Sequence, residues 1–254
     1  MKITTWNVNG IRARAPQVEE WLDVERPDVL CLQEVKANPD QVPLNIAGRD
    51  DYWSCWHGAG GYSGVAVLVR RELADESICM EHPPFDLEHR VASVLVDGLE
   101  VLSVYVPNGG KDYAAKLHFL DELGNYVAEA QREGRSLVVC GDLNVARTDK
   151  DLHPKERKAN AVGQRPDERE RFERVLGFGM VDVQRALHPE ADDLFTWWAP
   201  WRNLRQRNIG WRIDYVLASE SLSRSAATAE CRREFGTSDH APLTVEFEEG
   251  LRGG

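Results

Sequence analysis

Short apolar segments recur along the whole chain and limit the folds available to it. Each is a few residues long and rich in Val, Ile and Leu, which is typical of buried β-strands. The segments are residues 2–7, 29–33, 64–69, 91–96, 100–106, 137–140, 212–217 and 243–247. Helical periodicity is clear at residues 16–25, 112–132 and 167–176. Because strands outnumber helices, we expect an α/β fold of two sheets packed face to face with helices outside, rather than a doubly wound sheet.

Length and composition favour a single domain over residues 1–254. No Pro-, Gly- or Ser-rich tract would act as a linker, and sandwiches of about this length are commonly one domain. The sequence has no run of about 18 apolar residues and its first residues do not form a signal peptide, so neither a membrane span nor export is predicted. The five cysteines are widely spaced without a C-x-x-C pair, which favours a reduced cytoplasm over a disulfide framework or a zinc ribbon.

Polar residues suited to metal or phosphate chemistry stand at the ends of the apolar segments. They are Asn7, Glu34, Tyr105, Asp142, Asn144, Asp214, Asp239 and His240. Taken singly, each has an ordinary structural explanation, such as a solvated strand end, a turn or a cap. Because strand ends at one rim of a sandwich converge in space, their joint occurrence predicts one polar site.

These side chains meet the requirements of metal-assisted phosphodiester hydrolysis. Mg²⁺ prefers hard oxygen ligands and retains water, so one or two carboxylates suffice, and the cation offsets the charge that gathers on phosphate. Asp142 and Asn144 would lie on one face of an extended segment, where a carboxylate can take a proton from water. His240 needs an orienting carboxylate, and Asp214 is a better candidate than Asp239, which points away from His240 in an extended chain.

Six motifs carry a family resemblance. They are WNVNGIRA (residues 6–13), LQEVK (32–36), YVPN (105–108), GDLNVA (141–146), GWRIDY (210–215) and SDHAP (238–242). Through them the whole chain resembles the exonuclease III branch of the AP endonuclease family, within the exonuclease–endonuclease–phosphatase superfamily. The resemblance implies a four-layer α/β sandwich of two mixed, mostly antiparallel sheets.

The resemblance also implies a role for each matching position. Glu34 would be the main metal carboxylate, with Asn7 and Asp239 beside it, and a second metal position would fall near Asp142, Asn144 and His240. Asp142 would activate the attacking water and Asn144 would orient it, whereas His240, held by Asp214, would polarise the phosphate. Tyr105 would lie near the phosphate or the nucleophile. Whether one or two metals bind, and whether Tyr105 or Asp142 transfers the proton, stays open.

The net charge of the chain is −11, which disfavours a protein that coats nucleic acid by bulk charge. Local features nevertheless indicate a DNA substrate. Residues 155–165 and 201–214 each carry a local charge of +3. Such charges are often only those of solvated loops, but both segments flank the site, so we expect their basic residues, among them Arg205 and Arg207, to contact DNA phosphates. The resemblance implies that a snug pocket for a flipped-out abasic sugar is lined by Trp197, Trp211 and Ile213, although some tryptophans must pack in the core. Weaker candidates for holding DNA are Asn108, Lys111 and Asn160.

The prediction is therefore an enzyme, with two alternatives. We expect a Mg²⁺-dependent AP endonuclease, Mn²⁺ being a substitute, that cleaves duplex DNA 5′ of abasic sites and also has 3′-5′ exonuclease and 3′-end repair activity. Another superfamily enzyme, a general DNase or a phosphatase of lipids or inositol phosphates, is disfavoured by GWRIDY and Trp197. A catalytically inactive RNA-binding regulator is disfavoured because the polar positions are retained. The protein is expected to be a monomer, associated with the nucleoid in the cytoplasm of a bacterium or archaeon.

Overall fold

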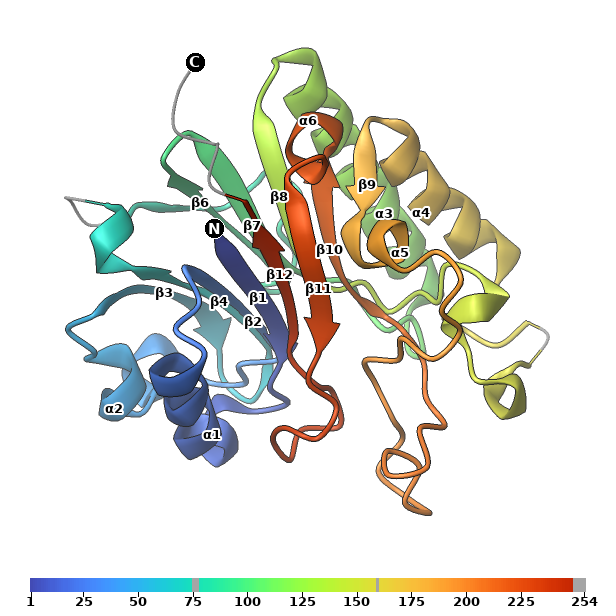
Figure 1. The fold of residues 1–254 in the computed structure, drawn as a ribbon, viewed down its shortest axis with the longest axis horizontal. Helices are drawn as coiled ribbons and strands as arrows, with labels where there is room; N and C mark the ends of the chain where they lie inside the picture. The colour runs from blue at the N-terminus through green and yellow to red at the C-terminus, as the bar shows by residue number, and fades with distance from the viewer. Residues whose placement is uncertain (75–77, 159, 249–254) are drawn as a thin grey trace.

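Two six-stranded sheets face one another in the computed structural model, which describes residues 1–74, 78–158 and 160–248 (Figure 1). The first sheet has the order β11 (Ala226–Cys231), β12 (Leu243–Phe247), β1 (Lys2–Asn7), β2 (Val29–Gln33), β4 (Tyr62–Arg70), β3 (Tyr52–Ala59). The second has the order β5 (Met80–Glu81), β6 (Val91–Val96), β7 (Leu99–Tyr105), β8 (Ser136–Asp142), β10 (Asp214–Ser219), β9 (Met180–Asp182). Within these sheets β1–β2 and β7–β8 pair in parallel and the other neighbours are antiparallel. The predicted fold class is confirmed.

Helices cover the outer faces of both sheets (Figure 1). They are α1 (Ile11–Val24) and α2 (Leu44–Ala47) on the first sheet, and α3 (Tyr113–Arg132) and α4 (Pro166–Gly177) on the second. Two short helices, α5 (Val183–Leu187) and α6 (Glu220–Ser223), instead pack side chains into the core between the sheets. The two parallel pairs are each joined through a long helix, α1 or α3, as parallel neighbours require. In the described part of the chain, no helix combines the length and apolar character needed to cross a membrane.

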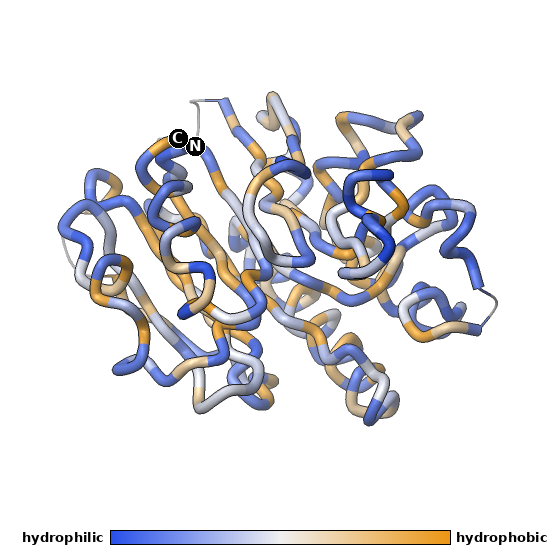
Figure 2. The backbone as a smooth tube through the Cα atoms, turned by 90° about the horizontal axis from the view of Figure 1, so that it is seen from below, coloured by the Kyte–Doolittle hydropathy of each residue, from blue (hydrophilic) through white to orange (hydrophobic). Residues whose placement is uncertain are grey.

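Successive side chains of the central strands point to opposite faces of each sheet, and this alternation produces the layers. In β2, Val29 and Cys31 belong to the core between the sheets, whereas Leu30 and Leu32 pack in the outer core with α1. In β8, Val138 likewise faces the other sheet and Val139 packs in the outer core with α3. Such strands are buried on both faces, which explains their continuous apolar sequence. Figure 2 shows hydrophobic residues recurring along the strands and hydrophilic residues along the outer loops.

Helix α1 begins earlier than the sequence pattern predicts. The expected helix started at Pro16, but the structure begins it at Ile11 and contains Pro16 inside it. Gly10 precedes the helix with a φ of 101°, a backbone conformation that favours glycine, and Ile11 is fully buried. The sharp turn at Gly10 therefore lets the helix start directly after the segment that follows β1. The other two predicted helices agree with α3 and α4 within one residue at each end.

Candidate active site

Strand register brings three of the predicted residues side by side. Tyr105 at the end of β7 pairs with Asp142 at the end of β8, and Asp142 pairs with Asp214 at the start of β10. In the opposite sheet, Asn7 at the end of β1 pairs with Gln33, which directly precedes Glu34. The site therefore lies where the same rim of both sheets meets, as the strand-end pattern predicted.

Asn7 joins the two sheets at this rim. Its Nδ2 donates to Glu34 Oε1 at 2.9 Å and to Asp142 Oδ2 at 2.9 Å. The Tyr105 hydroxyl donates to the same Glu34 oxygen at 2.9 Å. Ser238 Oγ in turn donates to the Asn7 backbone carbonyl at 2.7 Å. One fully buried amide thus fixes the spacing of two carboxylates that come from different sheets.

Lys36 and Asn9 belong to the site although no role was predicted for either. Lys36 Nζ lies 2.6 Å from Glu34 Oε2 and donates to Asn9 Oδ1 at 2.6 Å. Asn9 Nδ2 donates to Asp239 Oδ1 at 2.9 Å. Burial opposes ionisation of Glu34, but hydrogen bonds from Asn7 and Lys36 and the charges of His240 and Lys36 outweigh it and lower the pKa of Glu34. Glu34 is therefore ionised at neutral pH.

Asp142 and His240 are the most strongly perturbed acid and base of the site. Burial, together with the charges of Asp214 and Glu34, raises the pKa of Asp142 to about 7, although the charge of His240 opposes this rise. Burial alone would lower the pKa of His240, but the charges of Asp214 and Asp142 and the hydrogen bond to Asp214 raise it to about 10. His240 is thus an imidazolium at neutral pH, and Asp142 is poised between its two protonation states.

Asp214 contacts His240, the residue that it was predicted to orient. His240 Nδ1 lies 2.9 Å from Asp214 Oδ2, and the Thr196 hydroxyl donates to the same oxygen at 2.6 Å. Thr196 Oγ1 also accepts from the backbone nitrogens of Ile213 and Asp214. The other ring nitrogen, Nε2, points toward the site and lies 3.8 Å from Asp142 Oδ2, beyond hydrogen-bond distance. No sequence pattern indicated Thr196, because it reaches the pair from a distant loop.

Asn144 is held on several sides. Its backbone nitrogen donates to Asp142 Oδ1 at 2.9 Å, and its side-chain Nδ2 donates to the carbonyl of Val106 at 2.9 Å. Lys116 Nζ, which is fully buried, donates to the Asn144 carbonyl at 2.7 Å. Asn108 Nδ2 donates to Asn144 Oδ1 at 3.2 Å. The left-handed backbone at Asn144, with a φ of 52°, is therefore fixed by its neighbours and turns the chain after Asp142.

The donor set fits a hard divalent cation. One donor atom from each of Glu34, Asp142 and His240 lies within 4.8 Å of the others. A protonated imidazole has no lone pair to offer, so carboxylate and amide oxygens remain as ligands, and these are the ligands that Mg²⁺ prefers. Asp239 lies at the side of this cluster, where its Oδ2 accepts from Trp197 Nε1 at 2.9 Å.

A cavity of about 260 Å³ opens beside these polar groups, and the predicted pocket residues Trp197, Trp211 and Ile213 form its apolar wall. The two indole rings meet edge to face, with centroids 5.6 Å apart. Gly163 also lines the cavity, and a Cβ at this position would lie 2.8 Å from the Trp211 ring. Asn108 lines the same cavity. An apolar slot thus adjoins the acidic cluster.

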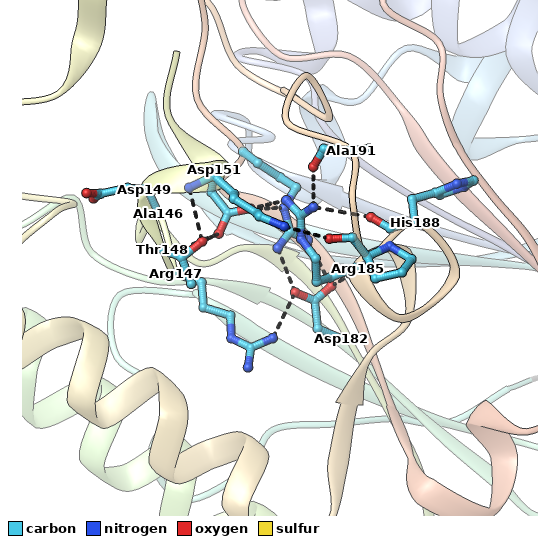
Figure 3. A network of polar contacts seen from close by, with 12 residues as sticks. Ala146, Arg147, Thr148, Asp149, Asp151, Asp182, Arg185, His188 and Ala191 are labelled. Atoms are coloured by element: carbon cyan, nitrogen blue, oxygen red, sulfur yellow. Dashed lines mark hydrogen bonds and ion pairs between the residues drawn. The ribbon is translucent and has the colours of Figure 1, made fainter. Parts of the chain in front are cut away.

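A buried ion network fixes the segment that carries Trp211 and Ile213 of this apolar wall. Arg212, which is fully buried, donates from Nε to Asp151 at 2.7 Å and from Nη2 to Asp182 at 2.6 Å. Arg185 Nη2 donates to the same Asp151 oxygen at 2.8 Å. Figure 3 shows Asp151, Asp182 and Arg185 converging from separate segments of the chain. Because Arg212 stands between Trp211 and Ile213, the network also fixes the positions of both.

The structure corrects the expectation that Arg205 contacts DNA phosphates. Its Nε donates to the Arg233 carbonyl at 2.6 Å, its Nη1 to Ser238 at 2.6 Å and its Nη2 to Phe235 at 2.7 Å. The guanidinium is thus hydrogen-bonded to main-chain carbonyls, and its Cζ lies 5.3 Å from the centroid of the Trp198 ring. Charge counting could not separate a solvated arginine from one that holds a loop in place. Arg205 is therefore a positioning residue for the segment before Asp239.

The remaining predicted DNA contacts lie outside the cavity. Lys111, Asn160 and Arg207 are exposed, and none is among the described residues that line it. Ala159, within the predicted basic segment 155–165, lies outside the described residues.

Comparisons with known proteins match nearly the whole chain. The model of the endonuclease/exonuclease/phosphatase family matches residues 4–240. An exodeoxyribonuclease of Bacillus subtilis is 35% identical over 96% of this chain and 98% of its own length. The solved structure of the 3′ phosphatase NExo from Neisseria, bound to a product DNA hairpin, has a TM-score of 0.88 at 32% identity, with 98% of this chain and 99% of that chain covered. The solved structure of an AP endonuclease from Archaeoglobus fulgidus has a TM-score of 0.87 at 32% identity, and the match covers 98% of this chain and 99% of that chain.

Proposed function

The chain belongs to the endonuclease/exonuclease/phosphatase family and is a DNA-repair nuclease, and we propose that it cleaves duplex DNA on the 5′ side of abasic sites in a Mg²⁺-dependent hydrolysis. The observation that carries this proposal is the position of a tryptophan-lined cavity directly beside Glu34, Asp142 and His240. A sugar without a base could enter such a slot while its 5′ phosphate lies on the polar groups.

In this proposal Glu34 supplies the main carboxylate oxygens to the cation, with Asn7 and Asp239 beside it, and Asn7 Nδ2 fixes Glu34 relative to Asp142. When bound, Mg²⁺ would supply charge that stabilises the phosphate in the transition state. The protein holds these ligands through Lys36 and Tyr105, which both contact Glu34.

Asp142 is assigned as the proton acceptor for the attacking water. A general base works best when its pKa lies near the operating pH, and the pKa of Asp142 is raised to about 7 by burial. Burial and the neighbouring Glu34 raise the pKa of Tyr105 far above neutrality, so Tyr105 stays a neutral phenol. Tyr105 would therefore donate a hydrogen bond, and Asn144, adjacent to Asp142, would hold the water.

His240 is assigned as the group that polarises the phosphate. Its Nδ1 is engaged by Asp214, so the proton on Nε2 points toward the site and can be donated to a phosphate oxygen. A charged donor aimed at developing negative charge stabilises a transition state more than a ground state.

A second activity at 3′ ends follows from the same geometry. The 3′ phosphatase from Neisseria, 32% identical over nearly the whole chain, was solved with a product hairpin. A terminal phosphate or nucleotide would present the same phosphoryl group to Asp142 and His240. We therefore propose 3′-end repair and 3′-5′ exonuclease activity in addition to incision, by a single-domain monomer that works on the bacterial or archaeal nucleoid in the cytoplasm.

One assay tests these assignments. Labelled duplexes with one abasic site, one 3′ phosphate or no lesion are incubated with Mg²⁺, with Mn²⁺ and with EDTA, beside an inositol phosphate and a single-stranded RNA. We expect incision at the abasic site that leaves a 3′-hydroxyl, and loss of activity in EDTA. A 3′ unsaturated aldehyde would indicate β-elimination and contradict hydrolysis. Faster turnover of the inositol phosphate would favour the phosphatase alternative, and RNA binding without cleavage of any substrate would favour the regulator.

A further inference from the structure

A second group of potential metal ligands lies apart from the nuclease site. It consists of His57 on β3 together with His82, Asp86 and His89 on the segment between β5 and β6. One donor atom from each of His57, His82 and Asp86 lies within 4.8 Å of the others. Because β3 and β5–β6 belong to different sheets, the cluster bridges the two halves of the sandwich.

The rings are packed around one carboxylate. His57 Nε2 lies 2.6 Å from Asp86 Oδ2. The His57 ring stacks on the His82 ring with centroids 3.8 Å apart, and the His89 centroid is 4.6 Å from that of His57. The ring nitrogens of His57 and His82 and the carboxylate of Asp86 therefore lie close enough together to bind one metal ion.

Asp86 is held in position by the backbone. Its Oδ1 accepts hydrogen bonds from the backbone nitrogens of Arg90 at 2.7 Å and of Val91 at 2.8 Å, which leaves Oδ2 directed at His57. The side chains of His57 and Asp86 are only 14% and 13% exposed. Metal-binding carboxylates are commonly fixed by such outer hydrogen bonds, which orient the ligand before the metal arrives.

We propose that His57, His82 and Asp86 form a binding site for a divalent transition metal, best matched by Zn²⁺, with His89 or water in the remaining position. Two imidazole nitrogens and one carboxylate oxygen are a donor set typical of zinc, whereas Mg²⁺ prefers oxygen donors throughout. Zn²⁺ would therefore bind at the histidine cluster and Mg²⁺ at the nuclease site.

The site would fasten a loop that leads to the nuclease centre. Arg90, whose backbone binds Asp86, places its guanidinium 4.7 Å from the centroid of the Tyr105 ring. A metal that joins His57 to Asp86 would therefore stabilise the connection between the edge of one sheet and the residue that contacts Glu34.

Zinc titration of the intact protein tests the proposal. The protein is stripped with EDTA, returned to millimolar Mg²⁺ so that the nuclease site is occupied, and titrated with Zn²⁺ against a chromogenic chelator. The variants are His82→Gln and, as a matched control, His118→Gln, because both side chains are exposed and neither substitution should unfold the chain. We expect one tight Zn²⁺, at least tenfold weaker binding in His82→Gln, and parental binding in His118→Gln.

A second pair of variants separates this site from the nuclease centre. Asp86→Asn should also weaken Zn²⁺ binding, whereas Glu34→Gln should not. Parental zinc affinity in both His82→Gln and Asp86→Asn, or loss of the tight zinc in Glu34→Gln, would overturn the proposal. The readout is zinc affinity in the presence of Mg²⁺, so it stays independent of whether the protein incises abasic DNA.

Discussion

His240 and Asp214 form a buried pair in which the imidazole Nδ1 lies 2.9 Å from the carboxylate Oδ2. The pair joins two sheets, because Asp214 starts β10 and His240 precedes β12. If Asp214 acts by orienting the charged ring, the two residues should behave as one unit. Double substitution is the appropriate measurement, since residues that act together give strongly non-additive losses.

We expect His240→Asn to lower kcat by about 10²–10³-fold, the loss typical of one missing donor to a developing oxyanion. Asp214→Asn should cost less, because the ring remains but is misoriented, and the double variant should cost little more than His240→Asn alone. Multiplicative losses in single-turnover assays would show that the residues act independently. Thr196→Val is a useful companion, because it removes the second donor to Asp214 and leaves the ring in place.

Glu34→Gln tests the metal assignment. The amide keeps the size of the carboxylate but removes its charge, so the Mg²⁺ concentration for half-maximal rate should rise by at least tenfold and the rate should partly recover at high Mg²⁺. Glu72→Gln, at an exposed glutamate of the same chain, is the control. Identical Mg²⁺ curves for Glu34→Gln and the parent would remove Glu34 from the cation site.

Stability of the metal-free protein should fall as the pH rises. A raised pKa means that the folded state binds the proton more tightly, so its contribution is present at low pH and disappears as the pH passes the folded value. The contribution of Asp142 to stability should decline between about pH 4 and pH 7, and that of His240 between about pH 6.5 and pH 10. Urea midpoints in EDTA from pH 5 to pH 10 measure the decline. In His240→Gln the curve of urea midpoint against pH should flatten above pH 7. An unchanged decline above pH 7 would contradict a buried imidazolium at His240.

Every strand that the sequence pattern missed is an edge strand. The missed strands are β3, β5, β9 and β11, which end the two sheets. Central strands are buried on both faces and therefore have continuous apolar sequences, whereas edge strands such as β11 keep exposed positions, for example Thr228 and Glu230, and give a weaker signal. The periodic signal thus located the middle of both sheets and failed at their edges, where β11 meets solvent and β5 and β9 are only two and three residues long.

The same distinction applies to the site. Residues that end central strands, such as Glu34 and Asp142, could be predicted because strand ends converge. Thr196 and the role of Arg205 could not, because both depend on a loop that reaches back across the rim, and the loop's path follows from tertiary contacts. A basic sequence also does not reveal whether a guanidinium faces solvent or main-chain carbonyls.

Salt dependence tests which arginines meet DNA. Arg207 is exposed, whereas the Arg205 guanidinium is hydrogen-bonded to main-chain carbonyls. Arg207→Ala should therefore make the slope of log affinity against log salt less steep, by about 0.9 for each phosphate that this side chain neutralises. Arg224→Ala, an exposed arginine that follows α6, should leave the slope unchanged. Filter binding to an uncleavable abasic duplex in Ca²⁺ gives the measurement. A parental slope in Arg207→Ala would place the DNA path away from this loop.

Asp142→Asn tests the proposed proton transfer. Asparagine keeps the size of the side chain and can still contact Asn7, but it cannot accept a proton from water. Loss of a general base typically costs about 10²–10⁴-fold, so kcat should fall by that factor while affinity for the abasic duplex survives. Tyr105→Phe keeps Asp142 intact and removes the phenol that contacts Glu34, so it should cost less. If Tyr105→Phe instead abolished turnover while Asp142→Asn retained most of it, the proton would have to pass through the phenol, and the neutral Tyr105 deduced from its burial beside Glu34 would be wrong.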